Sequence, residues 1–256
     1  MGYLLDIKNL TLGYGSKIIF SNITAAEQGG TLIALLGSNG RGKSTLLRTI
    51  AALEPLYGAN GQVLYNGKEA AYLTKEQMSK TVCFVTPLIE RTEYLSVKDL
   101  VATGSYFRTN WVGSLGREEE QRIEEALAAV GLESFGQRRC KSLSDGEFQR
   151  ATIAAALVQN SEIILLDEPT AFLDIANKYQ ITKMLREIAK EQGKLIIFST
   201  HDLQLALQLC NRLWIMGYDG FYCGATQELI DKGVADKIFS IEGVKFNQEK
   251  MSFTFE

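Results

Sequence analysis

The 256-residue sequence contains only three prolines, a single histidine and no long apolar run. Its apolar fraction of 46% and the lack of any low-complexity tract exclude a disordered or fibrous chain. No apolar stretch approaches the roughly 18 residues needed to cross a bilayer. The first ten residues lack the basic flank and apolar core of a signal peptide. We therefore expect a globular protein that reaches any membrane through a partner.

The sequence also has almost no excess of charge of either sign. Lys and Arg number 27 and Asp and Glu 30, which gives a net charge of −3. No nucleic acid is expected as a partner, because bulk positive charge is missing. The four cysteines lack the close spacing of a zinc site or a redox pair. We predict free thiols in a reducing cytosol, at Cys83, Cys140, Cys210 and Cys223.

Three short apolar runs occur at residues 31–36, 163–166 and 195–198. Such runs, without alternating polar residues, are typical of strands buried on both faces of a parallel sheet. An amphipathic helix is predicted between the last two runs, with Gly193 as its stop and one apolar face made of Ile181, Met184, Leu185, Ile188 and Ala189. The order strand, helix, strand favours a right-handed parallel crossover, so the predicted fold class is α/β.

Two other parts of the chain have different patterns. In the first thirty residues, short apolar segments separated by glycines predict strands and turns. From about residue 92 to 159 no comparable apolar run occurs. Apolar residues recur there at helical spacing, at Ile123, Ala126, Leu127 and Val130. We expect this stretch to be a mostly helical insertion into the α/β core.

A glycine-rich stretch after the first apolar run has the sequence GSNGRGKS, which fits the P-loop pattern GxxxxGK[ST]. Its glycines let successive backbone N–H groups converge on an anion, and the following helix N-terminus adds positive charge. Lys43 would reach the β- and γ-phosphates, and the Ser44 hydroxyl would bind Mg²⁺. The predicted ligand is a nucleoside triphosphate. The residues expected to hold it are Gly37, Ser38, Asn39, Gly40, Arg41, Gly42, Lys43, Ser44 and Thr45.

Two carboxylates and the histidine follow the other two apolar runs. Because ligands bind at the carboxyl ends of parallel strands, Asp167 and Glu168 are expected beside the P-loop. Neighbouring strand residues point to opposite sides, so Asp167 is predicted to hold Mg²⁺ and Glu168 to deprotonate the attacking water. His201 should reach the same edge and hydrogen-bond a γ-phosphate oxygen or that water. Lys43, Glu168 and His201 are thus the candidate catalytic residues.

Several motifs together resemble those of the ATP-binding cassette (ABC) transporter ATPases. Residues 143–150, LSDGEFQR, are similar to the LSGGQ signature, and residues 166–174, LDEPTAFLD, are similar to the Walker B motif and D-loop. His201 matches the family's switch histidine. Tyr14, 23 positions before Gly37, matches the aromatic residue that stacks on adenine. The resemblance implies that ATP and Mg²⁺ are the ligands.

The same resemblance implies a domain organisation. A P-loop NTPase (RecA-like) core with an N-terminal antiparallel β subdomain would comprise residues 1–87 and 159–256. Residues 88–158 would form an inserted helical subdomain, which carries the signature motif and docks on a permease. The whole chain, residues 1–256, would be one ABC ATPase domain.

The resemblance further implies a head-to-tail dimer with a second copy of the chain. Ser144 can cap the helix that begins near Gly146, and this helix start is a second anion site. In the family, the signature of one subunit closes over the nucleotide on the P-loop of the other. The residues that would contact the partner's nucleotide are Ser144, Asp145, Gly146 and Glu147.

Within the family, residues 95–106 resemble importers of iron-siderophore, heme or cobalamin chelates. This likeness implies polytopic permease subunits, an extracytoplasmic substrate-binding protein, and a peripheral place on the cytoplasmic face of the inner membrane. A divalent-metal importer or an exporter remains an alternative. Two further alternatives are an ABC protein that works without a permease and a nucleotide-dependent binding module that barely hydrolyses.

Two positions depart from the family pattern. Pro87, preceded by Thr86, stands where the family has a glutamine that senses Mg²⁺ and the permease. Asp145 stands where the signature has its first glycine. Because a carboxylate repels a γ-phosphate, we expect the Asp145 side chain to turn outward.

Overall fold

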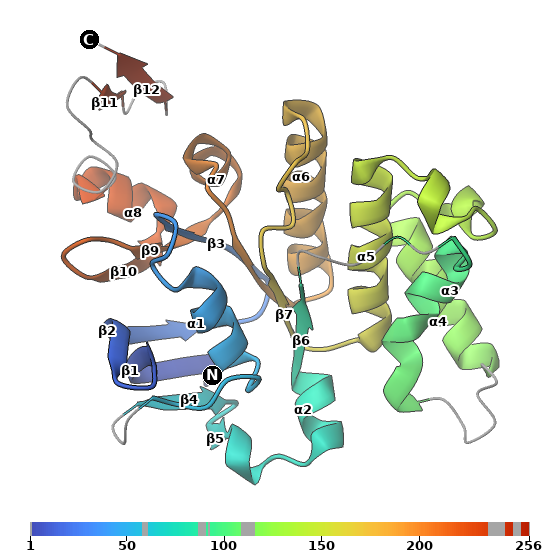
Figure 1. Cartoon of the computed structure of the whole chain (residues 1–256), viewed down its shortest axis with the longest axis horizontal. Helices are drawn as coiled ribbons and strands as arrows, with labels where there is room; N and C mark the ends of the chain where they lie inside the picture. The colour runs from blue at the N-terminus through green and yellow to red at the C-terminus, as the bar shows by residue number, and fades with distance from the viewer. Residues whose placement is uncertain are drawn as a thin grey trace.

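The computed structural model describes residues 2–57, 61–86, 91, 93–108, 116–234, 244–247 and 252–255. Its centre is a six-stranded sheet in the order β10-β9-β3-β8-β7-β6 (Figure 1). Neighbouring strands run parallel except at the β10–β9 edge. The strands are β3 (Thr31–Gly37), β6 (Val82–Val85), β7 (Ile163–Leu166), β8 (Leu195–Ser199), β9 (Arg212–Met216) and β10 (Phe221–Ala225).

The predicted α/β fold class is confirmed. The three apolar runs are β3, β7 and β8, and all three are buried along nearly their whole length. The helix α6 (Ile175–Glu191) joins β7 to β8, so the predicted crossover is present. It begins six residues before Ile181, the first residue of the predicted apolar face, and it ends before Gly193 as predicted.

Each central strand contributes to two cores, because successive side chains point to opposite faces of the sheet. Ile33 and Leu35 of β3 pack with α1 (Lys43–Ile50), whereas Leu32, Ala34 and Leu36 pack with the helices of the other face. The first core is closed by an antiparallel sheet in the order β2-β1-β4-β5. These strands are β1 (Leu5–Tyr14), β2 (Lys17–Glu27), β4 (Gln62–Tyr65) and β5 (Lys68–Glu69).

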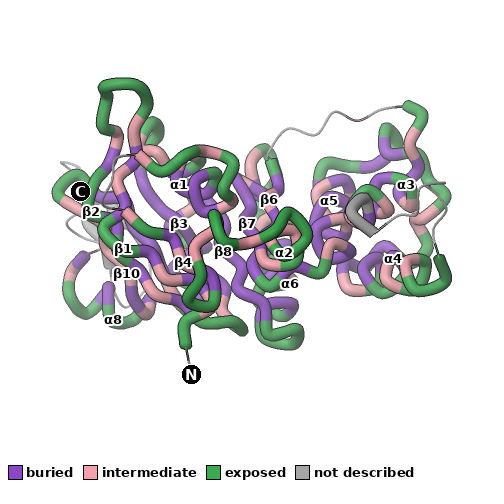
Figure 2. Tube along the Cα trace, turned by 90° about the horizontal axis from the view of Figure 1, so that it is seen from below, coloured by how far each residue is buried: buried purple, intermediate pink, exposed green. Residues whose placement is uncertain are grey.

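Among the described residues, three α-helices between β6 and β7 form a lobe at one end of the molecule (Figures 1 and 2). They are α3 (Val97–Ala102), α4 (Arg117–Ala129) and α5 (Asp145–Gln159), and α5 packs against both others. The helix α2 (Lys75–Thr81) leads into β6. The lobe falls where the helical insertion was predicted, and α5 ends at residue 159, one residue past the end of the proposed subdomain 88–158. The proposed boundaries of the subdomain stay a prediction.

The remaining described elements lie toward the C-terminus. They are α7 (Leu203–Leu209), α8 (Thr226–Asp231), β11 (Val244–Asn247) and β12 (Ser252–Phe255). Across the described residues, no helix is both long and apolar enough to traverse a bilayer.

All four cysteines are free thiols. Burial raises the pKa of Cys83 and of Cys210 to about 12 in each case. Since the thiolate is the reactive form, these two side chains serve as packing groups rather than nucleophiles.

Candidate active site

The P-loop lies between the carboxyl end of β3 and α1. Gly40 and Gly42 have φ values of 77° and 96°, a left-handed conformation that favours glycine. At Gly42 a Cβ atom would lie 2.9 Å from Ile19 Cγ2, so the turn leaves no room for a side chain. The backbone can therefore present its N–H groups closely to an anion.

Lys43 begins α1 and is only 6% exposed. Its Nζ atom donates to the carbonyl oxygens of Gly37 at 2.7 Å and Ser38 at 3.4 Å. Burial lowers the pKa of Lys43, and the nearby carboxylates of Glu168 and Asp167 oppose that shift. The lysine thus brings a charge to the loop, close to both acids.

The two acids at the end of β7 are held by a buried serine. Ser199, the last residue of β8, donates from Oγ to Asp167 Oδ1 at 2.7 Å. The same Oγ atom accepts the backbone N–H of Glu168 at 2.8 Å. One hydroxyl therefore fixes both the Asp167 carboxylate and the backbone that carries the Glu168 side chain. Sequence reasoning missed Ser199, although its place at the end of β8 was a usable signal.

Glu168 has a φ of 49°, which is uncommon for a residue with a Cβ atom. Such conformations concentrate at active sites, where the surrounding structure imposes them. The Glu168 Oε1 atom lies 2.7 Å from His201 Nε2. The predicted contact of His201 with a phosphate oxygen or water stays a prediction, and in this structure its partner is Glu168.

Tyr14 is half exposed at the end of β1, and its hydroxyl lies 3.2 Å from Thr45 Oγ1. A cavity of about 180 Å³ beside it is lined in part by Thr45 and Tyr57. A second tyrosine, Tyr218, also contacts the P-loop, with its ring centroid 4.1 Å from Arg41 Cζ and its hydroxyl 3.4 Å from Ser38 Oγ. Sequence reasoning missed Tyr218, because nothing in its surroundings marked it.

The signature segment starts α5, and Ser144 caps this helix as predicted. Ser144 Oγ accepts the N–H of Glu147 at 3.3 Å, and Glu147 Oε2 accepts the N–H of Ser144 at 2.8 Å. This N–H donation is the main reason why the pKa of the Glu147 carboxyl is lowered. Gly146 packs so closely on α6 that a Cβ atom would lie 2.5 Å from Asn177 Oδ1.

The Asp145 side chain is 66% exposed and forms an ion pair with Arg91, a residue that sequence reasoning missed. The Asp145 side chain therefore points outward as predicted, and Arg91 is its partner. Pro87, which stands in place of the family's glutamine, lies outside the described residues. Thr86 directly follows β6, at the same edge of the sheet as Asp167.

The structure gathers the P-loop, Asp167, Glu168 and His201 at the carboxyl ends of β3, β7 and β8. The residues Ser144–Glu147 belong instead to the helical lobe, separated from α1 by α6 and the central strands (Figure 1). Ser44 is exposed at the start of α1. The chain alone thus presents two separate helix starts, one at the P-loop and one at the signature segment.

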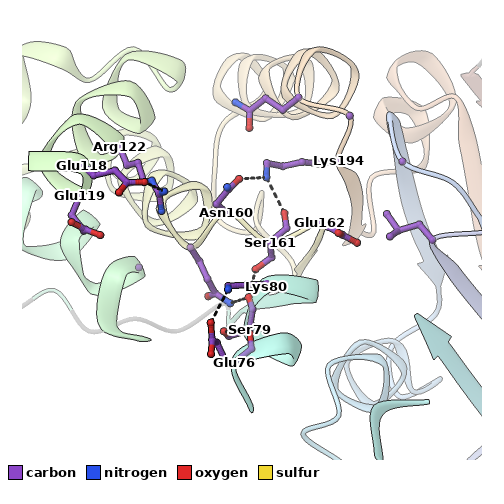
Figure 3. Close-up of a pocket in the computed structure, with 16 residues that line it drawn as sticks. Glu76, Ser79, Lys80, Glu118, Glu119, Arg122, Asn160, Ser161, Glu162 and Lys194 are labelled. Atoms are coloured by element: carbon purple, nitrogen blue, oxygen red, sulfur yellow. Dashed lines mark hydrogen bonds and ion pairs between the residues drawn. The ribbon is translucent and has the colours of Figure 1, made fainter. Parts of the chain in front are cut away.

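A cleft of about 880 Å³ lies at the opposite, amino edge of the sheet (Figure 3). Its buried lysine, Lys194, donates from Nζ to Asn160 Oδ1 at 3.0 Å and to the Ser161 carbonyl at 2.9 Å. Acidic and basic side chains are mixed around it, among them Glu118, Arg122 and Lys194. This cleft lies far from the P-loop and does not belong to the phosphate site.

A P-loop beside two strand-end carboxylates defines a P-loop nucleoside triphosphatase. The family model for ABC transporters matches residues 20–171, more than half of the chain. The chain belongs to the ABC transporter family, and it is an ATP-binding subunit with ATPase activity.

Similar curated proteins cover nearly the whole chain. The achromobactin transport ATP-binding protein CbrD of Dickeya dadantii is 34% identical over 92% of this chain and 87% of its own length. The siderophore transport system ATP-binding protein YusV of Bacillus subtilis is 35% identical over 93% and 86%, respectively.

Solved structures agree with this assignment. An ABC transporter assigned to the metal-chelate type, in an inward-facing conformation, matches with a TM-score of 0.79 and 25% identity. The match covers 99% of this chain and 96% of that one. CbiO1 of Clostridium perfringens, part of the ABC transporter complex CbiONQ, matches with a TM-score of 0.78 and 27% identity over 91% and 92%.

Proposed function

We propose that this ATPase energises the import of a metal chelate, either an iron-siderophore, heme or a cobalamin-type compound, through a separate membrane permease. The observation that carries the hydrolytic part is the Glu168–His201 hydrogen bond beside the P-loop lysine. The cargo class rests on the similar proteins, whose names specify achromobactin and siderophore transport.

The donors beside the P-loop suit Mg²⁺. Asp167 offers a carboxylate that Ser199 holds in place, and Ser44 offers an exposed hydroxyl. Among the described residues, no three His, Cys, Asp or Glu side chains gather as a metal cage. The remaining ligands would be phosphate oxygens and water, which is usual for Mg²⁺. Bound there, Mg²⁺ neutralises charge on the β- and γ-phosphates.

The side chains of the site then divide the work of hydrolysis. Lys43 binds the phosphates, for which it must leave the carbonyl oxygens of its own loop. Glu168 accepts a proton from the attacking water, and His201 keeps the carboxylate in place. Tyr14 stacks on the adenine ring.

The active unit is a head-to-tail dimer of two copies, in which residues 144–147 of one copy cover the triphosphate on the other. The exposed apolar surface next to the site supports this arrangement. Phe172 and Ile175, four and seven residues after Glu168 in the sequence, are 94% and 85% exposed. Large apolar side chains beside a functional site are typical of a surface that a partner covers.

The helical subdomain, residues 88–158, docks on the permease and transmits closure of the dimer. The core, residues 1–87 and 159–256, holds the nucleotide. The protein then works as a peripheral subunit on the cytoplasmic face of the inner membrane, and a substrate-binding protein delivers the chelate on the other side.

Glu168→Gln tests the hydrolytic part. This variant should lose at least about 99% of ATP turnover while it still binds ATP, because the carboxylate base is removed but the phosphate cradle is kept. The matched control is Glu162→Gln. Glu162 directly precedes the first residue of β7, at the opposite end of the strand from Glu168, and accepts a hydrogen bond from Asn66. Turnover by Glu168→Gln at the parental rate would contradict the assignment of the base.

The transport part is tested by reconstitution with the permease and binding protein encoded nearest to the gene. A ferric siderophore, presented on its binding protein, should stimulate ATP hydrolysis and accumulate inside the vesicles. Stimulation by a free divalent metal ion instead would favour the alternative cargo. ATPase activity without any copurifying permease would favour the alternative of an ABC protein that works without a permease.

A further inference from the structure

The first turn of α5 carries two carboxylates, Asp145 and Glu147, at the point where the proposed dimer places the partner's triphosphate. Acidic side chains suit the dipole at a helix start, but they repel an anionic ligand. Each carboxylate is paired with an arginine from outside the signature segment. Asp145 pairs with Arg91, and Glu147 lies 3.5 Å from Arg138. The charge of this turn is therefore balanced from outside it.

Arg91 touches the signature segment at three points. Its Nη1 atom donates to the Leu143 carbonyl oxygen at 3.0 Å, and its Nη2 atom donates to Asp145 Oδ1. Its Cζ atom lies 4.8 Å from the ring centroid of Phe148, one turn further along α5. Because these contacts fix the guanidinium against the start of the helix, they also fix the position of the Asp145 carboxylate.

We propose that Arg91 is a positioning residue for the ATP-bound dimer, in which it neutralises Asp145 and keeps that carboxylate away from the γ-phosphate of the facing subunit. The inference rests on the proposed dimer. Arg91 and Asp145 together then do what the signature's usual glycine does alone, namely leave the helix start open to an anion.

This role differs from simple support of α5 in one measurable respect. Loss of Arg91 should matter because it leaves the Asp145 carboxylate uncompensated, so the effect should disappear when that carboxylate is absent. Loss of packing on Phe148 or of the bond to Leu143 would instead weaken the protein whatever residue occupies position 145.

The experiment is a double-mutant cycle in the full-length Glu168→Gln protein, which should retain bound ATP. Arg91→Ala, Asp145→Gly and their combination are compared by the protein concentration at which MgATP gives half-maximal dimerisation in sedimentation velocity. Arg91→Gln is included because it keeps a donor for Leu143 but not the charge. Arg122→Ala is the matched control, since Arg122 also pairs with a carboxylate, Glu118, and its side chain is 29% exposed against 31% for Arg91.

With Asp145 present, Arg91→Ala and Arg91→Gln should each raise that concentration about tenfold. With Asp145→Gly, the same changes should raise it less than twofold. Arg122→Ala should stay within twofold, and ATP affinity at protein concentrations below dimerisation should be unchanged in every variant.

Equal effects of Arg91→Ala in both backgrounds would overturn this inference while the dimer proposal stands. If the Glu168→Gln parent forms no dimer with MgATP at any concentration, the dimer proposal fails and the inference fails with it.

Discussion

At the scale of single residues, the site depends on a side chain that never touches the substrate in our proposal. Ser199 is fully buried and joins Asp167 to the backbone of Glu168. It therefore holds the proposed metal ligand and the proposed base in one arrangement, and it does so across two neighbouring strands. Its hydroxyl is satisfied as both donor and acceptor.

Ser199→Ala should lower kcat about ten- to hundredfold, because both acids lose their common anchor and small displacements of catalytic groups are costly. It should also reduce the free energy of unfolding by about 1–3 kcal/mol, since buried polar groups lose a partner. The matched control is Ser161→Ala, which removes another fully buried serine, whose Oγ donates to the Ser79 carbonyl at the amino edge. That control should lose stability but keep kcat within twofold. Equal losses of kcat in the two variants would contradict the role of Ser199.

Tyr14 allows ring stacking to be separated from hydrogen bonding. Tyr14→Ala should weaken ATP binding about tenfold, in line with the loss of a base-stacking ring. Tyr14→Phe removes only the hydroxyl that lies 3.2 Å from Thr45 Oγ1. Its affinity for ATP should stay within twofold of that of the parent protein. Titration with a fluorescent ATP analogue measures both. Equal weakening by the two substitutions would show that the hydroxyl, not the ring, is what matters.

The site residues that could be predicted belong to short contiguous motifs, whereas those that were missed act through contacts between distant parts of the chain. The P-loop and the Asp167–Glu168 pair are short, contiguous motifs that follow apolar strands, so the sequence alone places them at one edge of the sheet. Arg91 acts on Asp145 across 54 positions of the chain. No periodicity or spacing encodes that pairing, because it exists only once α5 is in place.

At the scale of elements, the helical lobe is held together by a close backbone approach. Gly104 lies against α5, where a Cβ atom would be 2.1 Å from the Ala155 carbonyl oxygen and 3.0 Å from Val158 Cβ. The nearest of these atoms is backbone, which cannot rotate away. Glycine is required here for space, since its φ is not in the left-handed region.

Gly104→Ala should therefore reduce the free energy of unfolding by about 1–3 kcal/mol through overpacking. The matched control is Gly220→Ala in the turn between β9 and β10, where a Cβ atom would meet nothing within 4 Å. That substitution should change stability by less than about 0.5 kcal/mol. Urea unfolding of both variants measures the difference. A neutral effect of Gly104→Ala would mean that the lobe shifts easily on the core.

The limits of sequence reasoning at this scale are clearest in α6. Its apolar face over residues 181–189 was predicted because those positions face the core. That face does not locate the first turn of the helix, because Ile175 is exposed and does not belong to it. The actual start is fixed by Asp174, whose Oδ1 atom accepts the N–H of Asn177 at 2.8 Å. An aspartate is a common residue at a helix start, but other aspartates of this chain, such as Asp167, do not cap a helix.

At the scale of the whole molecule, the P-loop and the start of α5 lie on different lobes (Figure 1). In the proposed head-to-tail dimer, a second copy would give each P-loop the α5 start of its partner. ATP binding would then stabilise the association of the two subunits, and ATP hydrolysis would allow them to separate.

The apolar surface beside Glu168 provides the test at this scale. Phe172→Ser with Ile175→Ser removes two exposed apolar side chains that the proposed dimer would bury, each contributing about 1.5–3 kcal/mol when fully covered. The protein concentration that gives half-maximal specific ATPase activity should therefore rise at least about tenfold, while ATP affinity stays unchanged.

The matched control is Tyr72→Ser, which removes an apolar side chain that is also largely exposed but follows β5, in the antiparallel sheet. It should leave the concentration dependence as it is, because no partner is expected there. Specific activity that does not depend on protein concentration, with subunits that sediment as monomers in MgATP, would mean that one chain hydrolyses ATP alone. The paired arrangement would then be wrong, and the start of α5 would need another ligand.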